Sequence, residues 1–336
     1  MEVIGSQKNA TPELYAAEYY QQIIPLINAI FLCAFVSFFG IIANIINLIV
    51  YYRQGLKSTI NLSLFALAVA DLMCLLVQEW MVTVYFMSCL GVAVDYSDFF
   101  HLTGGLPHET LTRLTTSITV YITAERCICV VFPLKMKQII TIKRTAFILI
   151  FIYVVTFSSW IPLYSTSSLV WKFIPELNRT ILTSVTKAGK EEMDKVLYFI
   201  NAIFGVASVS TVICFTSVLI CMLRAKSVWR RSVSIQHNTD NAMSNRERTT
   251  STMVVLIAVI LVVCYMPSVI LCVVTFIEPE FNFGRRYVVI FDVFWSFAIL
   301  FEDISSSINI LLYIKMSSKY RNTLKTLFNK RFKNAF

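Results

Sequence analysis

The chain is dominated by long apolar stretches separated by short polar segments. Six of these stretches can each cross the hydrocarbon core of a bilayer, which takes about 20 helical residues. They are Ile24–Tyr52, Thr59–Tyr85, Arg144–Ser165, Val196–Leu223, Thr249–Phe276 and Val288–Ile314. The composition agrees, because 57% of the 336 residues are hydrophobic and 15% are charged, whereas about a quarter of a soluble domain is charged. The sequence therefore predicts an integral membrane protein.

Charge asymmetry adds a seventh crossing. Cytoplasmic loops are rich in Lys and Arg, and the segments 53–57, 135–144, 224–248 and 315–333 hold most of the 29 basic residues. Only Asp240 and Glu247 oppose them there. A further crossing is therefore required between Thr59–Tyr85 and Arg144–Ser165, and the weaker candidate Leu102–Phe132 is the one available. This predicts an all-α membrane protein with seven transmembrane helices, an outer N-terminus and an inner C-terminus.

Three parts are expected along the chain: an extracellular N-terminus over 1–23, the seven-helix bundle over 24–314, and an amphipathic helix with a short cytoplasmic tail over 315–336. The start of the chain lacks a basic segment followed by an apolar core, so the first span is expected to serve as its own insertion signal. The Asn-x-Thr triplets at Asn9 and Asn178 fall on the expected outer side, where glycosylation can occur. The cysteines are interpreted as free buried thiols.

Short motifs in several of the stretches identify a family. They read LAVADL at 67–72, ERC at 125–127, CYMP at 264–267, NILLY at 309–313 and KYRN at 319–322, with Asn44 in the first stretch. In order and spacing, these motifs resemble those of rhodopsin-like (class A) G-protein-coupled receptors from Asn44 to Phe328. The resemblance implies a receptor for an extracellular ligand that activates a heterotrimeric G protein at the plasma membrane, and not an enzyme.

The chain also departs from the family pattern. Cys127 replaces a Tyr, Tyr265 a Trp and Ile310 a Pro. His101 stands where the family has its outer cysteine, and the loop over 166–195 has no Cys, so both halves of the usual disulfide are missing. These departures favour a divergent invertebrate chemosensory or neuropeptide receptor. Cys127 and Ile310 also leave open a decoy receptor that binds a ligand without signalling.

An acid in the middle of an apolar helix, Asp71, is costly unless it is paired or hydrated. The resemblance implies a sodium or water site there, and no other cofactor is expected. The residues expected to converge on Asp71 are Asn44, Thr115, Ser305, Ser306 and Asn309. The alternative is a protonated carboxyl group that bonds to the neighbouring Asn and Ser side chains.

The resemblance also implies an activation switch. Arg126 is expected to pair with Glu125 and to reach Glu247 at the base of the sixth helix, so that loss of the pair lets that helix swing outward and admit a G protein. Pro267 should kink the same helix. Tyr265, Asn309 and Tyr313 are expected to repack during the change. The alternatives are an Arg126 that snorkels to lipid headgroups and a Tyr265 that is a core aromatic.

The outer half of the bundle is unusually polar, which indicates a ligand site. The candidate ligand-binding residues are Glu79, His108, Glu109, Thr112, Arg113, Tyr265, Glu302 and Asp303. Glu109 and Arg113 lie four residues apart and are expected to pair, which leaves an excess of acid and favours a cationic ligand such as a basic peptide or amine. His108 stands where amine receptors carry their anchoring Asp, so a conventional monoamine is disfavoured. The alternative is that these groups satisfy one another.

The C-terminal segment predicts an amphipathic helix on the inner membrane surface. Its apolar positions are Met316, Tyr320, Leu324, Leu327 and Phe328, among several Lys and Arg residues. The basic residues flank spans on one side of the membrane, so the net charge of +9 does not indicate a nucleic-acid partner. A transporter is disfavoured because the helices show no repeat and are not broken by Gly or Pro.

Overall fold

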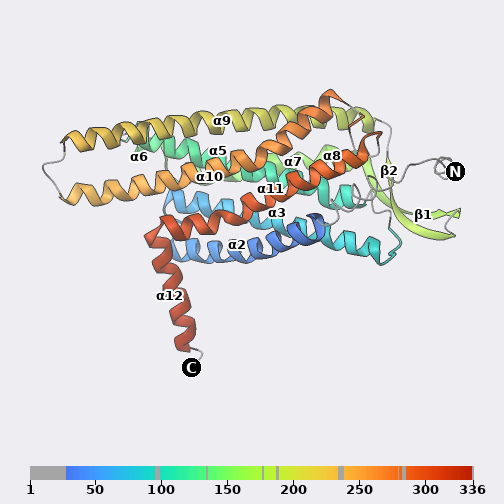
Figure 1. The fold of residues 1–336 in the computed structure, drawn as a ribbon, viewed down its shortest axis with the longest axis horizontal. Helices are drawn as coiled ribbons and strands as arrows, with labels where there is room; N and C mark the ends of the chain where they lie inside the picture. Colours follow the sequence, from blue (N-terminus) through green and yellow to red (C-terminus); the bar gives the residue numbers. More distant parts are fainter. Residues whose placement is uncertain are drawn as a thin grey trace, which may run out of the picture.

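The computed structural model describes residues 28–94, 99–133, 135–175, 178–186, 189–233, 238–278, 280–281 and 285–334. Long helices lie side by side and alternate in direction (Figure 1). In chain order the described elements are η2 (Asn28–Cys33), α2 (Ala34–Gln54), α3 (Thr59–Cys89), η3 (His101–Gly105), α5 (Leu106–Val131), α6 (Met136–Ile139), α7 (Ile142–Ser158), α8 (Trp160–Thr166), β1 (Ser167–Ile174), β2 (Arg179–Thr186), α9 (Lys190–Val233), α10 (Asn238–Ile277), α11 (Val288–Met316) and α12 (Ser318–Asn334).

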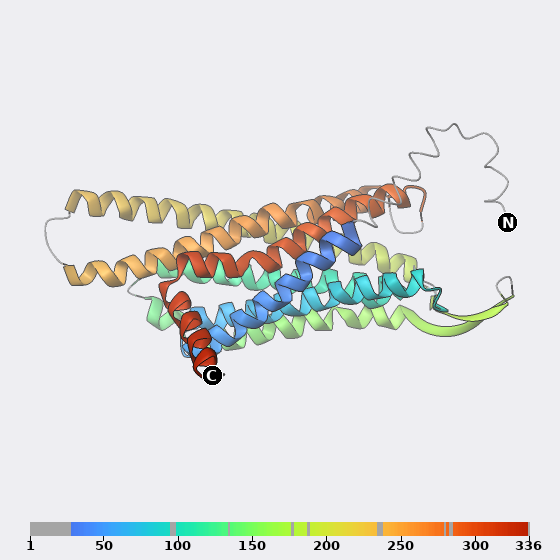
Figure 2. The same ribbon diagram turned by 60° about the horizontal axis from the view of Figure 1, so that its bottom comes forward.

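The two ends of the bundle differ (Figures 1 and 2). One end carries the strands β1 and β2 and is called here the hairpin end. At the other end, called the α12 end, α12 turns away across the axis of the bundle, and α9 and α10 project beyond the other helices. The chain crosses between the ends as α2, α3, α5, α7 with α8, α9, α10 and α11. The predicted seven-helix bundle with a separate C-terminal helix is therefore confirmed.

Length and apolar composition alone identify five of the described helices as able to cross a membrane. These are Phe31–Gln54, Thr59–Met87, His101–Val131, Phe199–Lys226 and Arg248–Ile277. The span Leu102–Phe132, which hydropathy favours least, is among them. The fourth crossing is divided because α7 has only 17 residues and α8 resumes after Ser159. The seventh crossing, α11, carries the buried acids Glu302 and Asp303 in its middle.

The helices bury the side chains that face one another and expose those that face outward. Small and aliphatic side chains such as Ala70, Leu114 and Val254 are fully buried between helices, whereas large apolar ones such as Phe147 and Ile150 are exposed on the outside. An outer surface of this kind suits hydrocarbon rather than water. The fourth crossing is attached by polar contacts, in which the Tyr153 hydroxyl donates to the Ala66 carbonyl at 2.8 Å.

The hairpin of β1 and β2 was not predicted, because the segment 166–195 was expected to be only a loop. The strands pair antiparallel from Ser167 opposite Thr186 to Ile174 opposite Arg179. β-Branched and aromatic residues fill both strands, which favours a pleated conformation. The amide of Leu182 also donates to the carbonyl of Ala93 at 2.9 Å, which attaches the hairpin to the segment after α3.

The apolar face of α12 lies against the bundle. Tyr320 is 1% exposed, and Leu324 and Leu327 pack against the core. The Tyr320 hydroxyl donates to Asn47 Oδ1 at 2.7 Å, and burial raises the pKa of this hydroxyl, which keeps its proton available for the bond. The first turn of α12 is thereby fixed to α2.

Close contact between α2 and α11 depends on Gly40. A Cβ atom at this position would lie 2.1 Å from Ser307 Oγ and 2.7 Å from Leu75 Cδ1, so a side chain here must push α11 or α3 away. The Ser307 hydroxyl also donates to the Val36 carbonyl at 3.2 Å, one turn from Gly40. At Gly40 the backbone of α2 therefore lies directly against α11.

We expect Gly40→Val to lower the free energy of unfolding by about 1–3 kcal/mol, the usual cost of overpacking. The measurement is thermal unfolding of the purified protein in nanodiscs. Phe39→Val serves as the control, because Phe39 is 54% exposed on the outer surface. Equal transition temperatures for the two variants would show that the contact between α2 and α11 can yield at no cost.

Candidate functional site

The centre of the polar cluster at the hairpin end is His108, which is 2% exposed. It lies in the first turn of α5 beside Pro107, where α5 continues directly from η3. Its Nδ1 atom is 3.5 Å from Glu302 Oε2 and its Nε2 atom is 3.4 Å from Asp303 Oδ1. Because both ring nitrogens face carboxylate oxygens, the geometry suits an imidazolium, which has two N–H donors.

Glu302 joins three helices. The Thr112 hydroxyl on α5 donates to its Oε2 atom at 3.0 Å, and the Ser268 hydroxyl on α10 donates to its Oε1 atom. Ser268 is the residue after Pro267, the proline within α10. The carboxylate on α11 therefore bonds to α5 and to α10 directly beside the point where proline removes a helical hydrogen bond.

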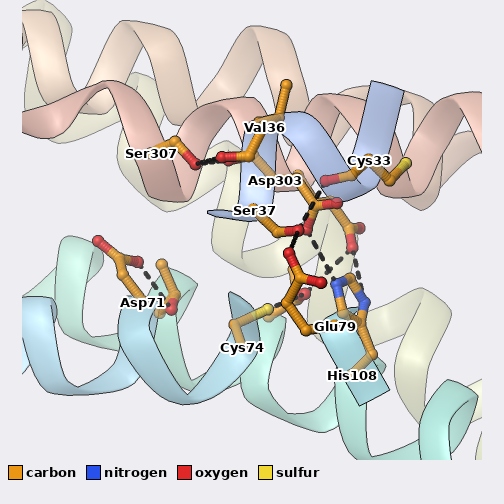
Figure 3. Close-up of polar contacts among 12 residues, drawn as sticks. Cys33, Val36, Ser37, Asp71, Cys74, Glu79, His108, Asp303 and Ser307 are labelled. Atoms are coloured by element: carbon orange, nitrogen blue, oxygen red, sulfur yellow. Dashed lines mark hydrogen bonds and ion pairs between the residues drawn. The ribbon is translucent and has the colours of Figure 1, made fainter. Parts of the chain in front are cut away.

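Two further acids lie around His108 (Figure 3). Asp303 is fully buried, and its Oδ2 atom accepts no hydrogen bond, although the Cys33 thiol lies beside the carboxylate. Glu79 on α3 accepts a hydrogen bond from the Ser37 hydroxyl at 2.7 Å. The structure thus brings Glu79, His108, Thr112, Glu302 and Asp303 together from α3, α5 and α11.

The direct pair expected between Glu109 and Arg113 is not formed. Asn201 on α9 stands between them, accepting a hydrogen bond from Arg113 Nη1 and donating one to Glu109 Oε1. Arg113 Nη2 donates to Thr110 Oγ1 at 2.8 Å. The expectation was wrong because it considered one helix alone, whereas an amide from α9 reaches both charged groups. Glu109 and Arg113 face α9, on a different side of α5 from His108.

Asp71 lies in the middle of the bundle. Its Oδ1 atom accepts from the Thr115 hydroxyl at 3.2 Å, and its Oδ2 atom from Asn309 Nδ2 at 2.9 Å. Ser306 interacts with the same carboxylate. Oxygen atoms of this kind suit a hard cation such as sodium, and so the residues fit such an ion, although the neutral donors also suit a protonated carboxyl group.

Asn44 and Ser305 are placed differently from the other residues expected at Asp71. The side-chain amide of Asn44 donates to the carbonyls of Ser306 and Gly40 at 2.9 and 3.0 Å, and so it holds α2 to α11. Ser305 is partly buried, with no hydrogen bond to Asp71. Two of the five expected partners, Asn44 and Ser305, therefore do not bond to the acid.

At the α12 end, Arg126 Nη2 donates to Glu125 Oε1 at 2.6 Å. Glu125 is buried and also accepts from the Ser63 hydroxyl on α3 at 3.1 Å. The side chain of Glu247, the expected partner on the sixth helix, lies outside the described residues. The contact between Glu125 and Arg126 thus holds the arginine against α3 and α5.

The aromatic residues expected in the switch are buried. Tyr265 is 9% exposed and packs against Val209 and Val269, so α10 meets α9 at this level. The Tyr313 ring lies 5.3 Å from the Tyr51 ring and 5.6 Å from the Tyr320 ring, between ring centroids. Tyr313 therefore packs between α2 and α12 in this conformation.

Several residues at these sites were missed from the sequence. They are Ser37, Asn47, Ser63, Asn201, Ser268 and Ser307. The first five of them lie in apolar stretches and are less than a tenth exposed, and a polar residue inside such a stretch is a signal in itself. The signal does not reveal the partner, because most of these bonds join helices that are far apart in the sequence.

Comparison with known proteins agrees with this architecture. The family model of the serpentine type 7TM GPCR chemoreceptor Srw matches residues 30–331, and the chain belongs to this family of G-protein-coupled receptors. It is also 24% identical to the thyrotropin-releasing hormone receptor of Gallus gallus, over 97% of this chain and 84% of that protein. The galanin-like G-protein coupled receptor npr-9 of Caenorhabditis elegans is 24% identical over 94% of this chain and 76% of its own length.

Replacing Asn201 tests the bridge between Glu109 and Arg113. We expect Asn201→Ala to lower the free energy of unfolding by about 1–3 kcal/mol, since buried polar groups lose their partner. Thermal unfolding of the purified protein measures the effect. Thr211→Ala is a matched control on the same helix, because its hydroxyl bonds only to the carbonyl of Ala207 within α9. A loss in the control as large as that in Asn201→Ala would contradict the role of the bridge.

Proposed function

We propose that the protein is a cell-surface receptor that binds an extracellular ligand at the hairpin end and activates a heterotrimeric G protein at the α12 end. The observation that carries the proposal is the position of Glu302, which lies on α11 and bonds to α5 and, beside Pro267, to α10. A ligand that competes for this carboxylate releases Ser268 and so frees α10 at its proline. Membership of a receptor family and two relatives named as receptors support the same function.

Charge favours a cationic ligand. Glu79, Glu302 and Asp303 are three acids at the hairpin end, and among the described residues His108 is the basic side chain that contacts two of them. Arg113 is held with Glu109 and Asn201 on the side of α9. A positive group on the ligand therefore meets complementary charge. Peptides with basic groups and amines are the ligand classes of this kind.

The response to the ligand is proposed to pass through α10. Outward movement of its inner half separates α10 from α5, where Arg126 now bonds to Glu125. Glu247 is proposed to restrain α10 in the resting state through Arg126. A sodium ion at Asp71 would be held by the oxygen atoms of Asp71, Thr115 and Ser306, and would supply a positive charge that keeps α3, α5 and α11 together.

The experiment that tests the function is a signalling screen. Cells that express the chain with a promiscuous G protein are treated with basic peptides, amines and small odorants, and second-messenger release is measured. A response is expected that falls at least about tenfold in Arg126→Ala at matched surface expression, because this arginine belongs to the proposed switch. Lys319→Ala, exposed on α12, is the comparison for general effects of charge removal.

Other results of the screen would lead to different conclusions. Binding of a ligand without any signal favours the decoy receptor, for which Cys127 and Ile310 are the reason in the sequence. A response that survives in Arg126→Ala contradicts the proposed switch. Transport of a radiolabelled amine without second-messenger release would contradict the receptor function itself.

The orientation in the plasma membrane has a separate test. Asn178 is exposed in the turn between β1 and β2, in the sequence Asn178-Arg179-Thr180, while Asn9 lies outside the described residues. We expect the glycosidase-sensitive mass of the protein to fall in Asn178→Gln and to stay unchanged in Asn61→Gln, whose Asn-Leu-Ser triplet lies at the α12 end. A glycan on Asn61 would reverse the proposed orientation.

A further inference from the structure

The polar cluster at the hairpin end has more acceptors than donors. Glu79, Glu302 and Asp303 supply six carboxylate oxygens, whereas the donors that contact them come from His108 and from hydroxyl groups such as those of Ser37 and Thr112. Among the described residues, no N–H or O–H group donates to the Asp303 Oδ2 atom, although Asp303 is fully buried and the thiol of Cys33, a weak donor, lies beside its carboxylate. A buried acceptor without a donor is unfavourable, so this atom points to a missing donor.

A second buried acceptor without a donor lies on a different helix. Gln78 on α3 is 2% exposed, and its Oε1 atom has no hydrogen-bond partner. Gln78 carries no charge and precedes Glu79 in the chain. It is therefore a second buried acceptor that lacks a donor among the described residues, and it does not depend on the charge of the acids.

The face of α3 that carries Gln78 packs on α5. Four residues before it, Cys74 Sγ lies 3.6 Å from Thr112 Oγ1. Three residues after it, Met81 meets Gly104, so closely that a Cβ on the glycine would lie 2.5 Å from Met81 Cγ. Residues three and four apart share one face of a helix. Gln78 is thus placed toward α5 between the levels of Gly104 and Thr112, the level at which His108 lies.

We propose that Gln78, Glu79, Glu302 and Asp303 form a subsite for an organic cation with several N–H donors, of which a guanidinium group fits best. This inference rests on the proposed ligand-binding function and specifies its ligand. A guanidinium has five N–H donors in a planar fork and a primary ammonium has three. A quaternary ammonium has no N–H donor, so it would leave the Gln78 Oε1 and Asp303 Oδ2 atoms without a hydrogen bond.

His108 lies beside this subsite and does not fill it. Its two ring nitrogens face one oxygen of Glu302 and one of Asp303, so the second oxygen of Asp303 stays available. Two acids and one imidazolium leave one negative charge, and Glu79 adds another. A ligand cation therefore enters beside His108 without having to expel it, and the positive charges are separated by the carboxylates.

The experiment uses three probes of similar size with the purified full chain in nanodiscs. They are N-acetyl-arginine amide, its uncharged isostere N-acetyl-citrulline amide, and N-acetyl-trimethyllysine amide, which is charged but has no N–H on its cationic group. Thermal unfolding is followed over a series of probe concentrations at constant ionic strength. We expect a saturable rise of the transition temperature with the arginine probe alone.

Two variants locate the effect. Asp303→Asn should raise the concentration needed for half of the rise by about thirtyfold or more, as expected when a buried, hydrogen-bonded charge pair loses one member. Gln78→Leu should raise it by about tenfold and should fold well, because it removes an acceptor that has no donor. Thr211→Ala, remote from the subsite on α9, should bind the probe like the unaltered chain.

The subsite is overturned if the arginine probe gives no saturable rise, if the trimethyllysine probe matches it, or if neither Asp303→Asn nor Gln78→Leu weakens it. The result is separate from the signalling screen, because binding to the purified protein needs no G protein. A saturable rise with a silent screen leaves the subsite and contradicts signalling. A screen that finds an uncharged ligand at full potency leaves the receptor function and contradicts the subsite.

Discussion

The hydrogen bonds of Glu302 are the interaction on which the arrangement of the outer helices depends. A carboxylate in the middle of an apolar bundle is stable only when partners from the surrounding helices reach it. Thr112 and His108 reach it from α5 and Ser268 from α10. The helices must therefore hold one another at the level of this group, and any ligand that draws on the same carboxylate acts on all three at once.

Below Glu302, α5 is joined to its neighbours again at two further levels. Asp71 bonds to Thr115 of α5 and Asn309 of α11, and Glu125 on α5 bonds to Ser63 of α3. Each level places an acid among hydroxyl or amide donors from neighbouring helices. α5 takes part at every level, so a shift of this helix along its axis would disturb all the acids together.

The sequence predicted the bundle better than the site. Apolar length and the distribution of Lys and Arg located seven crossings, including one that hydropathy favours least. At Asp71 the carboxylate contacts Thr115, Ser306 and Asn309, whereas Asn44 bonds to backbone carbonyls instead. The contacts of Glu109 and Arg113 could not be found, because the deciding residue, Asn201, lies on another helix. Spacing along one helix reports neighbours on that helix only.

The loss of proline at position 310 has a mechanical consequence. α11 runs without an internal proline from Val288 to Met316, whereas α10 contains Pro267. A helix without proline keeps all its backbone hydrogen bonds and bends less easily, so bending is concentrated in α10. The bond between Ser268 and Glu302 then joins the helix that bends to the helix that does not. The absence of proline from the last crossing therefore leaves this link between α11 and the proline-containing helix α10 in place.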